Sequence, residues 1–483
     1  MVRAQQARPD NEYRPRALLR QPDLAGDLSL MSASSNSPAS VLRSPLPASL
    51  TMVLWTSIST LAAAAAIFGG MALVILVLAV GLGVYVWKHP EEALGAGLLF
   101  LFAAQIVIPS PARFNYESSD MSPMYYWATG LLIITTAAVM RLGLRRVFAV
   151  PLPAKVFLGA ALASAVYAEA QGAATSYVAR QFYGILLLIV YLGIASRVGD
   201  EQLLLRRART FGLLCTLCFL IYYCAIFGEY GFHRETGSQG AQATMFALLL
   251  MIAGLNARRP SWVLSALVIM LVPALLFMRR DLVAFLVALP IALAVRSRTW
   301  KLRLACCCLV ALIALPGVYP PVAQSIGEGL QRTPVIGDAI PPTTESAASL
   351  YDRAVQADAA LNTLRTHPWL GEGLGSTLQW ESSYQGFVEE GYVDNGWAYL
   401  FQKMGILGAV AFLWLLATVF ACFSRNSVSL TACVLSAALV TMFSEPVFFH
   451  FTTAPYLGAF AGLLLARKDR TRVDAARFCP KVA

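Results

Sequence analysis

The chain has 483 residues, of which 58% are hydrophobic and 13% are charged, and its formal net charge is +10. A soluble domain needs about twice that share of charged residues to cover its surface, so the composition excludes an ordinary soluble protein and indicates a polytopic membrane protein. The positive charges form short clusters between apolar segments, which is typical of residues that set membrane orientation and argues against nucleic acid as a partner.

Cysteine and histidine usage predicts neither a disulfide nor a metal site. Of the nine cysteines, Cys479 lies in the basic tail, and the others lie in or at the ends of apolar segments. The four histidines are scattered along the chain without metal-ligand spacing. We therefore expect no structural disulfide, no metal and no cofactor.

Residues 1–49 carry mixed charges, proline and serine with little periodicity, which predicts a disordered cytoplasmic tail. The stretch lacks the charged, apolar and small-residue order of a cleaved signal. We therefore expect the first span to be retained.

Apolar segments of membrane-crossing length occupy most of the remaining chain. A hydrocarbon core of about 30 Å needs about 20 apolar residues per helix. Fourteen such segments fall near residues 50–69, 70–87, 91–109, 123–140, 152–170, 181–196, 210–228, 240–256, 261–278, 282–298, 302–318, 396–418, 428–444 and 449–466. The first two could be one broken segment, so we expect an all-α polytopic membrane protein with about 12 to 14 transmembrane helices.

The distribution of lysine and arginine predicts the orientation of these helices. With a cytoplasmic N-terminus, the basic clusters fall in the cytoplasmic connections and in the C-terminal tail at 467–483. A bundle of about eleven helices then covers 50–318, and further helices cover 396–466. The hydrophilic segment at 319–395 becomes one large periplasmic loop.

Several arginines fall on the outer face, where the charge rule disfavours them. A cation near membrane level costs free energy unless it is paired or faces a watery cavity. Any single one could reach headgroup phosphates or a nearby carboxylate. For the set, an anion site is favoured, because the planar guanidinium suits a pair of phosphate oxygens. The set is Arg180, Arg234, Arg279, Arg280, Arg353 and Arg365.

The long loop contains apolar residues at helical spacing, which predicts an amphipathic helix of about four turns over the mouth of the bundle. We expect it to start at Ser349, where Ser349 and Asp352 resemble a capping box, and to end at His367-Pro368. The periodic residues are Leu350, Ala354, Ala357, Leu361 and Leu364. The opposite face carries Arg353, Asp358 and Arg365, and a solvated surface is the simpler interpretation for Asp358.

Two short motifs follow this helix. Gly371, Gly373 and Gly375 stand at alternate positions, which lets a backbone turn tightly or approach a ligand closely. Glu389-Glu390 is most simply part of a hydrated loop.

Asp394-Asn395 directly precedes an apolar helix at the outer interface. Either residue could cap that helix by accepting hydrogen bonds from its free backbone N–H groups. Alternatively, the Asp394 carboxylate, at the mouth of a cavity lined by arginines, could accept a proton from a hydroxyl nucleophile. Both roles remain open from the sequence.

The order of four motifs resembles the bacterial O-antigen ligase and O-antigen polymerase superfamily. The motifs are RETGSQGAQAT, FMRRDLVAFLVALPIAL, YDRAVQADAALNTLRTHPWLGEGLGS and DNGWAYLFQKMGILG. The last two are the most specific, because His367, Pro368 and the three glycines fall as in the family's H-P-x-x-G-x-G-x-G. The resemblance covers roughly the C-terminal half of the chain, and the N-terminal half is similar in topology alone.

The resemblance implies glycan transfer at the periplasmic face of the bacterial inner membrane, without metal or nucleotide sugar. A sugar chain would leave an undecaprenyl-diphosphate carrier for a hydroxyl, and other polysaccharide assembly proteins would be partners. By resemblance, Asp394 and Arg280 would be catalytic. Substrate binding would fall to a further set, namely Arg180, Arg234, Arg279, Arg353, His367 and Asn395.

The chain departs from the family pattern at two positions. Ligases of the family carry His-Asn where this chain has Asp394-Asn395, and Asp281 stands where the family usually has glycine. The missing histidine favours a polymerase of O-antigen, capsule or exopolysaccharide repeat units over a lipid A core ligase. A ligase or a protein O-oligosaccharyltransferase remains the nearest alternative, and a transporter or flippase of a lipid-linked anion belongs to another class. Charges near the midplane and two similar halves, which are typical of transporters, are not evident in the sequence.

Overall fold

The structure, a computed structural model, describes residues 70–107, 122–230, 238–256, 258–272, 344–382, 386–422, 435, 438–439, 442, 447–450 and 453–478. They belong to one compact unit, Thr60–Ala483. The apolar segments expected near 50–69, 282–298 and 302–318 lie outside the described residues, as do most of the segment near 428–444 and the N-terminal tail, whereas the expected C-terminal tail at 467–483 is helical as far as Phe478.

Helices dominate the described residues. Their bounds are α3 Gly70–Lys88, α4 Ala93–Val107, α5 Ser122–Leu142, α6 Leu144–Val147, α7 Leu152–Ala170, α8 Thr175–Val198, α9 Glu201–Tyr230, α10 Ser238–Asn256, α11 Pro260–Ile269, α17 Thr344–Asn362, α18 Gly396–Ala421 and α20 Ala454–Phe478, with 3-10 turns η2 Pro90–Glu92 and η5 Thr363–Arg365. Within the described chain, α7, α8 and α18 are long and apolar enough to cross a membrane, and shorter apolar helical stretches occur at 73–88, 126–142, 243–255, 260–269 and 454–466. These findings support a mostly helical membrane protein.

Two helices begin before the apolar segments that predicted them. The segment expected at 210–228 extends back to Glu201, where the Asp200 carboxylate accepts from the N–H groups of Gln202 and Leu203 at 2.9 and 3.3 Å. This is an N-cap, which hydropathy alone does not detect. The segment expected at 181–196 similarly extends back to Thr175.

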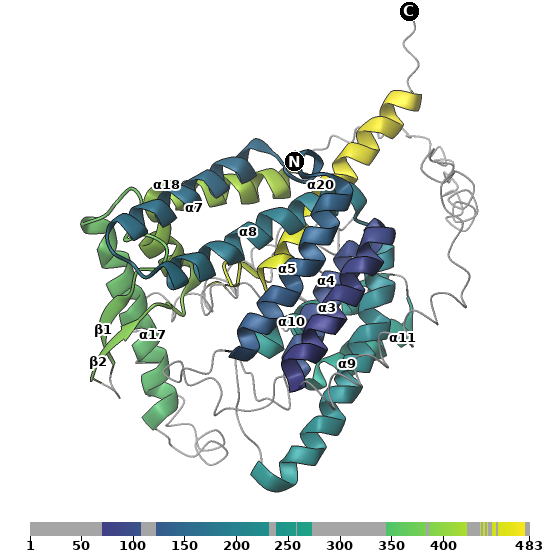
Figure 1. Ribbon diagram of the computed structural model, residues 1–483, viewed down its shortest axis with the longest axis horizontal. Coiled ribbons are helices and arrows are strands. Elements are labelled where there is room, and N and C mark those ends of the chain that lie inside the picture. Colours follow the sequence, from purple (N-terminus) through teal and green to yellow (C-terminus); the bar gives the residue numbers. More distant parts are fainter. Residues whose placement is uncertain are drawn as a thin grey trace, which may run out of the picture. The chain divides into compact units, whose positions relative to one another are not determined.

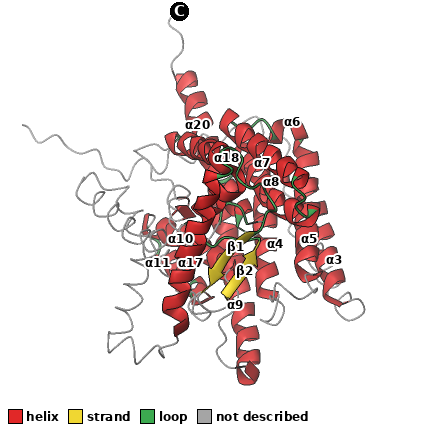
Figure 2. Cartoon of the chain, turned by 90° about the vertical axis from the view of Figure 1, so that its left-hand side faces the viewer, coloured by secondary structure: helices red, strands yellow, loops and turns green. Residues whose placement is uncertain are grey.

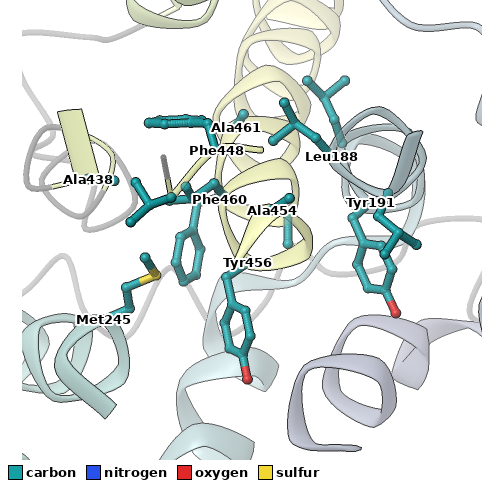
Figure 3. Packing of buried hydrophobic residues seen from close by; sticks show 14 of the residues in the cluster. Leu188, Tyr191, Met245, Ala438, Phe448, Ala454, Tyr456, Phe460 and Ala461 are labelled. Carbon is teal, nitrogen blue, oxygen red and sulfur yellow. The ribbon is translucent and has the colours of Figure 1, made fainter. Parts of the chain in front are cut away.

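Close helix packing forms the core. Helices α8 and α20 contact along their lengths, because Gly458 and Gly462 of α20 face the carbonyl oxygens of Leu188 and Leu192 and leave no room for a side chain. Figure 3 shows α20 with Leu188 and Tyr191 of α8 on one side and with Phe460 directed to the other side, toward Met245 of α10. The hydroxyl of Tyr456 is satisfied inside this core, since it donates to the carbonyl oxygen of Leu98 at 2.5 Å.

The loop segment, residues 344–395, connects to the N-terminal end of α18. It contains α17, η5, a turn and two antiparallel strands, β1 Leu378–Ser382 and β2 Gly386–Glu390. Helix α17 contacts β1 and α18, and α7 lies along α18 (Figure 1). Figure 2 shows the strands beside α17. This hairpin was not expected in an all-α fold, and it includes Glu389 and Glu390, so the prediction of a simple hydrated loop there is wrong.

Candidate functional site

The buried face of α17 positions polar groups over the start of α18. Ala354 and Ala357 of the predicted apolar stripe are at most 1% exposed, as is the neighbouring Ala360, whereas Leu361 and Leu364 are half-buried. The helix starts at Thr344, so the predicted capping box at Ser349 is wrong. Asp352 instead accepts a hydrogen bond from the hydroxyl of Ser382 in β1 at 2.7 Å.

The structure shows which residue of Asp394-Asn395 caps α18. Asn395 is the N-cap, and its Oδ1 accepts from the N–H groups of Trp397 and Ala398, each at 3.0 Å. Asn395 is 3% exposed, so it serves as a structural cap. The Asp394 carboxylate is therefore not required for capping.

Asp394 pairs with Arg353 across 41 residues of sequence. The Nε of Arg353 donates to Oδ2 of Asp394 at 2.8 Å, and the two side chains are 31% and 32% exposed. Arg353 is therefore a partly exposed partner of Asp394 rather than an isolated surface charge. An ion pair this exposed contributes about 1 kcal/mol or less to stability, so its main effect is to orient the two groups. Both remain accessible to a ligand.

Gln356 links the same aspartate to a second acid. Its Oε1 accepts from the backbone N–H of Asp394 at 2.8 Å, and its Nε2 donates to Oε2 of Glu390 at 2.8 Å and to the carbonyl of Tyr392 at 3.2 Å. Gln356 is 3% exposed. Because Arg353 and Gln356 are three residues apart, one face of α17 holds both Asp394 and Glu390.

The environment of Glu390 differs from that of Asp394. Partial burial, followed by the charge of Asp394, raises the pKa of the Glu390 carboxyl above its ordinary value of 4.5. In the described part of the chain, Glu390 forms no salt bridge, whereas Asp394 does. The two acids therefore differ in their charged neighbours.

The glycine-rich turn after α17 packs against other helices. Gly371, Gly373 and Gly375 have φ values of 65°, 94° and 92°. A Cβ at Gly373 would lie 2.6 Å from the Cβ of Ala168 in α7, and one at Gly375 would lie 2.6 Å from the side chain of Val178 in α8. These glycines therefore allow close approach to protein rather than to a ligand.

The turn also supplies hydrogen-bond partners for backbone groups at a break in α18. At Gly405, φ is 59° and ψ is −160°, so the regular helix hydrogen bonds stop. The N–H of Ile406 donates to the carbonyl of Pro368 at 2.9 Å instead of to its helical partner, Gln402. The freed carbonyl of Gln402 accepts from the N–H of Glu372 at 2.7 Å.

The next pair of backbone groups is satisfied in the same way. The N–H of Leu407 donates to the carbonyl of Trp369 at 3.2 Å. The carbonyl of Lys403 accepts from the hydroxyl of Ser164 in α7 at 2.5 Å, and Ser164 accepts in turn from the N–H of Leu374 at 3.0 Å. Buried backbone groups need such partners, so the turn, α7 and α18 form one bonded unit.

Gln181 of α8 joins this unit to the residues before α18. Its Oε1 accepts from the N–H of Gly375 at 2.7 Å, and its Nε2 donates to the carbonyl of Gly391 at 2.9 Å. The neighbouring Arg180 is half-buried and lies within electrostatic reach of Tyr399, one turn beyond Asn395. Arg180 therefore belongs to the same end of the helices as Asp394.

Lys403 is a buried cation near the start of α18. It is fully buried, and its Nζ donates to the carbonyl and hydroxyl of Ser376 at 2.5 and 3.2 Å. It also lies 5.7 Å from the centre of the Tyr399 ring. These contacts tie α18 to the turn.

His367 lies apart from the Arg353–Asp394 pair. It follows η5, is exposed, and forms a 3.3 Å hydrogen bond through Nδ1 with the Tyr167 hydroxyl of α7. The distance along α17 from Arg353 to the helix end at Asn362 is about 14 Å at 1.5 Å per residue. The structure therefore does not bring His367 to the pair.

The other predicted site residues, Arg234, Arg279 and Arg280, lie outside the described residues. Within the described chain, no group of three or more His, Cys, Asp or Glu side chains could hold a metal ion. The predicted residues that the structure does bring together are Arg353, Asp394 and Asn395, with Arg180 at the same helix ends. Sequence reasoning missed Gln356, whose position three residues after Arg353 was an available signal, and Gln181, Glu390 and Lys403.

Comparison with models of known protein families finds no match, and comparison with characterised proteins finds none either. The arrangement itself consists of an accessible guanidinium–carboxylate pair, a second and less ionisable carboxylate, and a further arginine at the ends of apolar helices. Such a site can bind a phosphate-bearing lipid and accept a proton from a hydroxyl.

Proposed function

We propose that the chain is a polymerase of lipid-linked glycan repeat units. The observation that carries the proposal is the Arg353–Asp394 pair, in which two independently predicted site residues meet at the N-terminal end of an apolar helix. In the proposed reaction, a glycan passes from undecaprenyl diphosphate to a sugar hydroxyl at the periplasmic face of a bacterial inner membrane.

The site chemistry supports this reaction. The bond between the anomeric carbon and the phosphate oxygen breaks, and the electron pair stays with the diphosphate. Guanidinium groups stabilise the charge that develops there, and in the described part of the chain the terminal nitrogens of Arg353 are not used by another hydrogen bond. The acceptor hydroxyl loses its proton to a carboxylate of the site. The position beside α18 gives a lipid-borne substrate access from the membrane.

The test is polymer formation in a strain that lacks the chromosomal gene and carries variants on a plasmid. Asp394→Asn, Arg353→Ala and Arg280→Ala are expected to abolish long polymer while lipid-linked single repeat units persist. Asp358→Asn is the matched control, because Asp358 is exposed on α17 and bonds Asn362 within the same helix. Unchanged polymer length in Asp394→Asn and Arg353→Ala, at equal protein levels, would contradict the proposal.

The acceptor distinguishes this function from its nearest alternatives. Purified protein in lipid nanodiscs is given a lipid-linked oligosaccharide with a second repeat unit, with lipid A core, or with an acceptor protein. Polymerase activity predicts product with the repeat unit alone. Product with lipid A core or protein would identify a ligase or an O-oligosaccharyltransferase, and movement of donor across vesicles without new glycosidic bonds would identify a transporter.

A further inference from the structure

The loop segment brings two acids of different character to one face of α17. Asp394 is engaged by Arg353 and directly precedes the N-cap of α18. The guanidinium of Arg353 and the N-terminus of α18 both place positive charge beside the Asp394 carboxylate. This carboxylate is therefore already engaged as the partner of a cation.

Glu390 has the opposite surroundings. It is half-buried in the last position of β2, and the Gln356 amide fixes its Oε2. The charged groups that act on it are both carboxylates, Asp394 ahead of α18 and Asp352 on α17, while Arg353 is directed to Asp394. An acid that is desolvated and lies beside like charges binds a proton more tightly than a solvated one.

Two neighbouring carboxylates with such different environments suit different chemical roles. We propose that Glu390, rather than Asp394, is the base that accepts the proton of the acceptor hydroxyl, while Arg353 and Asp394 form a charged pair that positions the diphosphate. This inference rests on the proposed function. The acceptor oxygen forms the new bond to the anomeric carbon as its O–H bond breaks, and the proton moves to a Glu390 oxygen. The diphosphate leaves with the electron pair, and Glu390 then returns the proton to water.

Gln356 is a positioning residue in this scheme. Its Oε1 is fixed by the N–H of Asp394, so its Nε2 must face Glu390 and Tyr392. The amide thereby holds Glu390 at a fixed position relative to the Arg353–Asp394 pair. Glu389, the next residue along β2, is exposed and accepts from the Thr377 hydroxyl at 2.6 Å, so it provides a matched carboxylate away from the proposed reaction.

The experiment measures transfer by the full-length protein in nanodiscs, with lipid-linked oligosaccharide as donor and acceptor, across a range of pH. For the native protein, kcat is expected to rise with pH as Glu390 loses its proton. Glu390→Gln should lower kcat by about 100-fold or more with little change in KM, and should remove the acidic limb of the profile. Glu389→Gln should retain both kcat and the limb.

The Asp394→Asn variant distinguishes the role of Asp394 from that of Glu390. Loss of its charge should raise KM and move the acidic limb to lower pH, because the negative charge that raises the pKa of Glu390 is gone. Loss of the limb in Asp394→Asn, with the limb and kcat retained in Glu390→Gln, would assign the base to Asp394 and overturn the inference. Absence of transfer by the native protein would overturn the proposed function and the inference with it. A melting temperature for each variant identifies any that fails to fold.

Discussion

Arg353 and Gln356 bind different parts of the same residue. Arg353 bonds the side chain of Asp394, and Gln356 bonds its backbone N–H and also reaches Glu390. Replacing a buried amide that makes three hydrogen bonds lowers the stability of the fold, because each buried partner left without a hydrogen bond costs about 1–3 kcal/mol. The geometry at Asp394 therefore depends more on the buried glutamine than on the exposed ion pair.

Replacing Gln356 tests this dependence. Gln356→Leu keeps the side-chain size but leaves the N–H of Asp394 without its partner, so protection of residues 386–395 against hydrogen exchange should fall by about 10-fold or more. Asp358→Asn, on the exposed face of the same helix, should leave that protection unchanged. Equal protection in native and Gln356→Leu proteins would show that the bond network does not hold this segment.

Glu390 also makes stability depend on pH. Its pKa is raised in the folded protein, so the folded state holds the proton more tightly than the unfolded state. Stability is therefore lost as pH rises from the ordinary value of 4.5 through the raised value, and it is constant above that range. The melting temperature of Glu390→Gln relative to the native protein should increase over the same interval. A difference that is independent of pH would contradict the assignment.

At the scale of the element, the glycine-rich turn serves as a connector between helices. Its backbone satisfies the groups exposed by the break at Gly405, and its glycines contact α7 and α8. Polar backbone in this position is stable only when its partners lie within the protein. The apparent ligand-binding motif therefore has a structural role in the described chain.

Two glycines with similar φ values allow the stability cost of backbone strain to be measured separately from the cost of a packing clash. Gly373 and Gly172 have φ values of 94° and 88°, but a Cβ at Gly172 meets nothing within 4 Å. Gly172→Ala should therefore cost about 1 kcal/mol of stability from backbone strain alone. Gly373→Ala adds a clash with Ala168 and should cost about 1–3 kcal/mol more, seen as a larger drop in melting temperature. Equal drops would mean that the turn does not pack tightly on α7.

The sequence allowed α17 to be predicted because its alanines recur at helical spacing, which is a local signal. Its start was misplaced because Ser349 and Asp352 resemble a capping box, whereas Asp352 in fact bonds Ser382, a contact that depends on the hairpin. The strands have five residues each, and β1 packs against α17, which is distant in sequence, so no local pattern marked them. At the site, six arginines were candidates, and the sequence did not indicate which would meet Asp394. Which arginine meets Asp394 is known only from the path that the loop segment takes in the structure.

At the scale of the whole molecule, the composition and the apolar helices predict integral membrane association. The exposed apolar side chains of α7 and α18, including Leu162, Val166, Val410 and Leu413, have no favourable environment in water. The protein should remain in the membrane fraction after alkaline carbonate extraction and be released by detergent. Release by carbonate alone would contradict membrane insertion.

Side-specific labelling tests the proposed orientation. In a background without native cysteines, Asp358→Cys on the loop segment should react with an impermeant maleimide added to spheroplasts, because residue 358 is exposed and is predicted to be periplasmic. Arg145→Cys, exposed in α6 between α5 and α7, should react only after the membrane is opened. The reverse pattern would invert the topology and place the site on the other side of the membrane.

The break at Gly405 divides α18 into two parts with different surroundings. Residues 396–404 are held by the turn and by α17, whereas the exposed apolar side chains of the helix, including Ile406, Leu407 and Trp414, all follow the break. A bilayer of different thickness changes the tilt of the lipid-facing part. The turn bonds Gln402 before the break and Ile406 after it, so a change of tilt would reach Asn395 through the turn as well as along the helix.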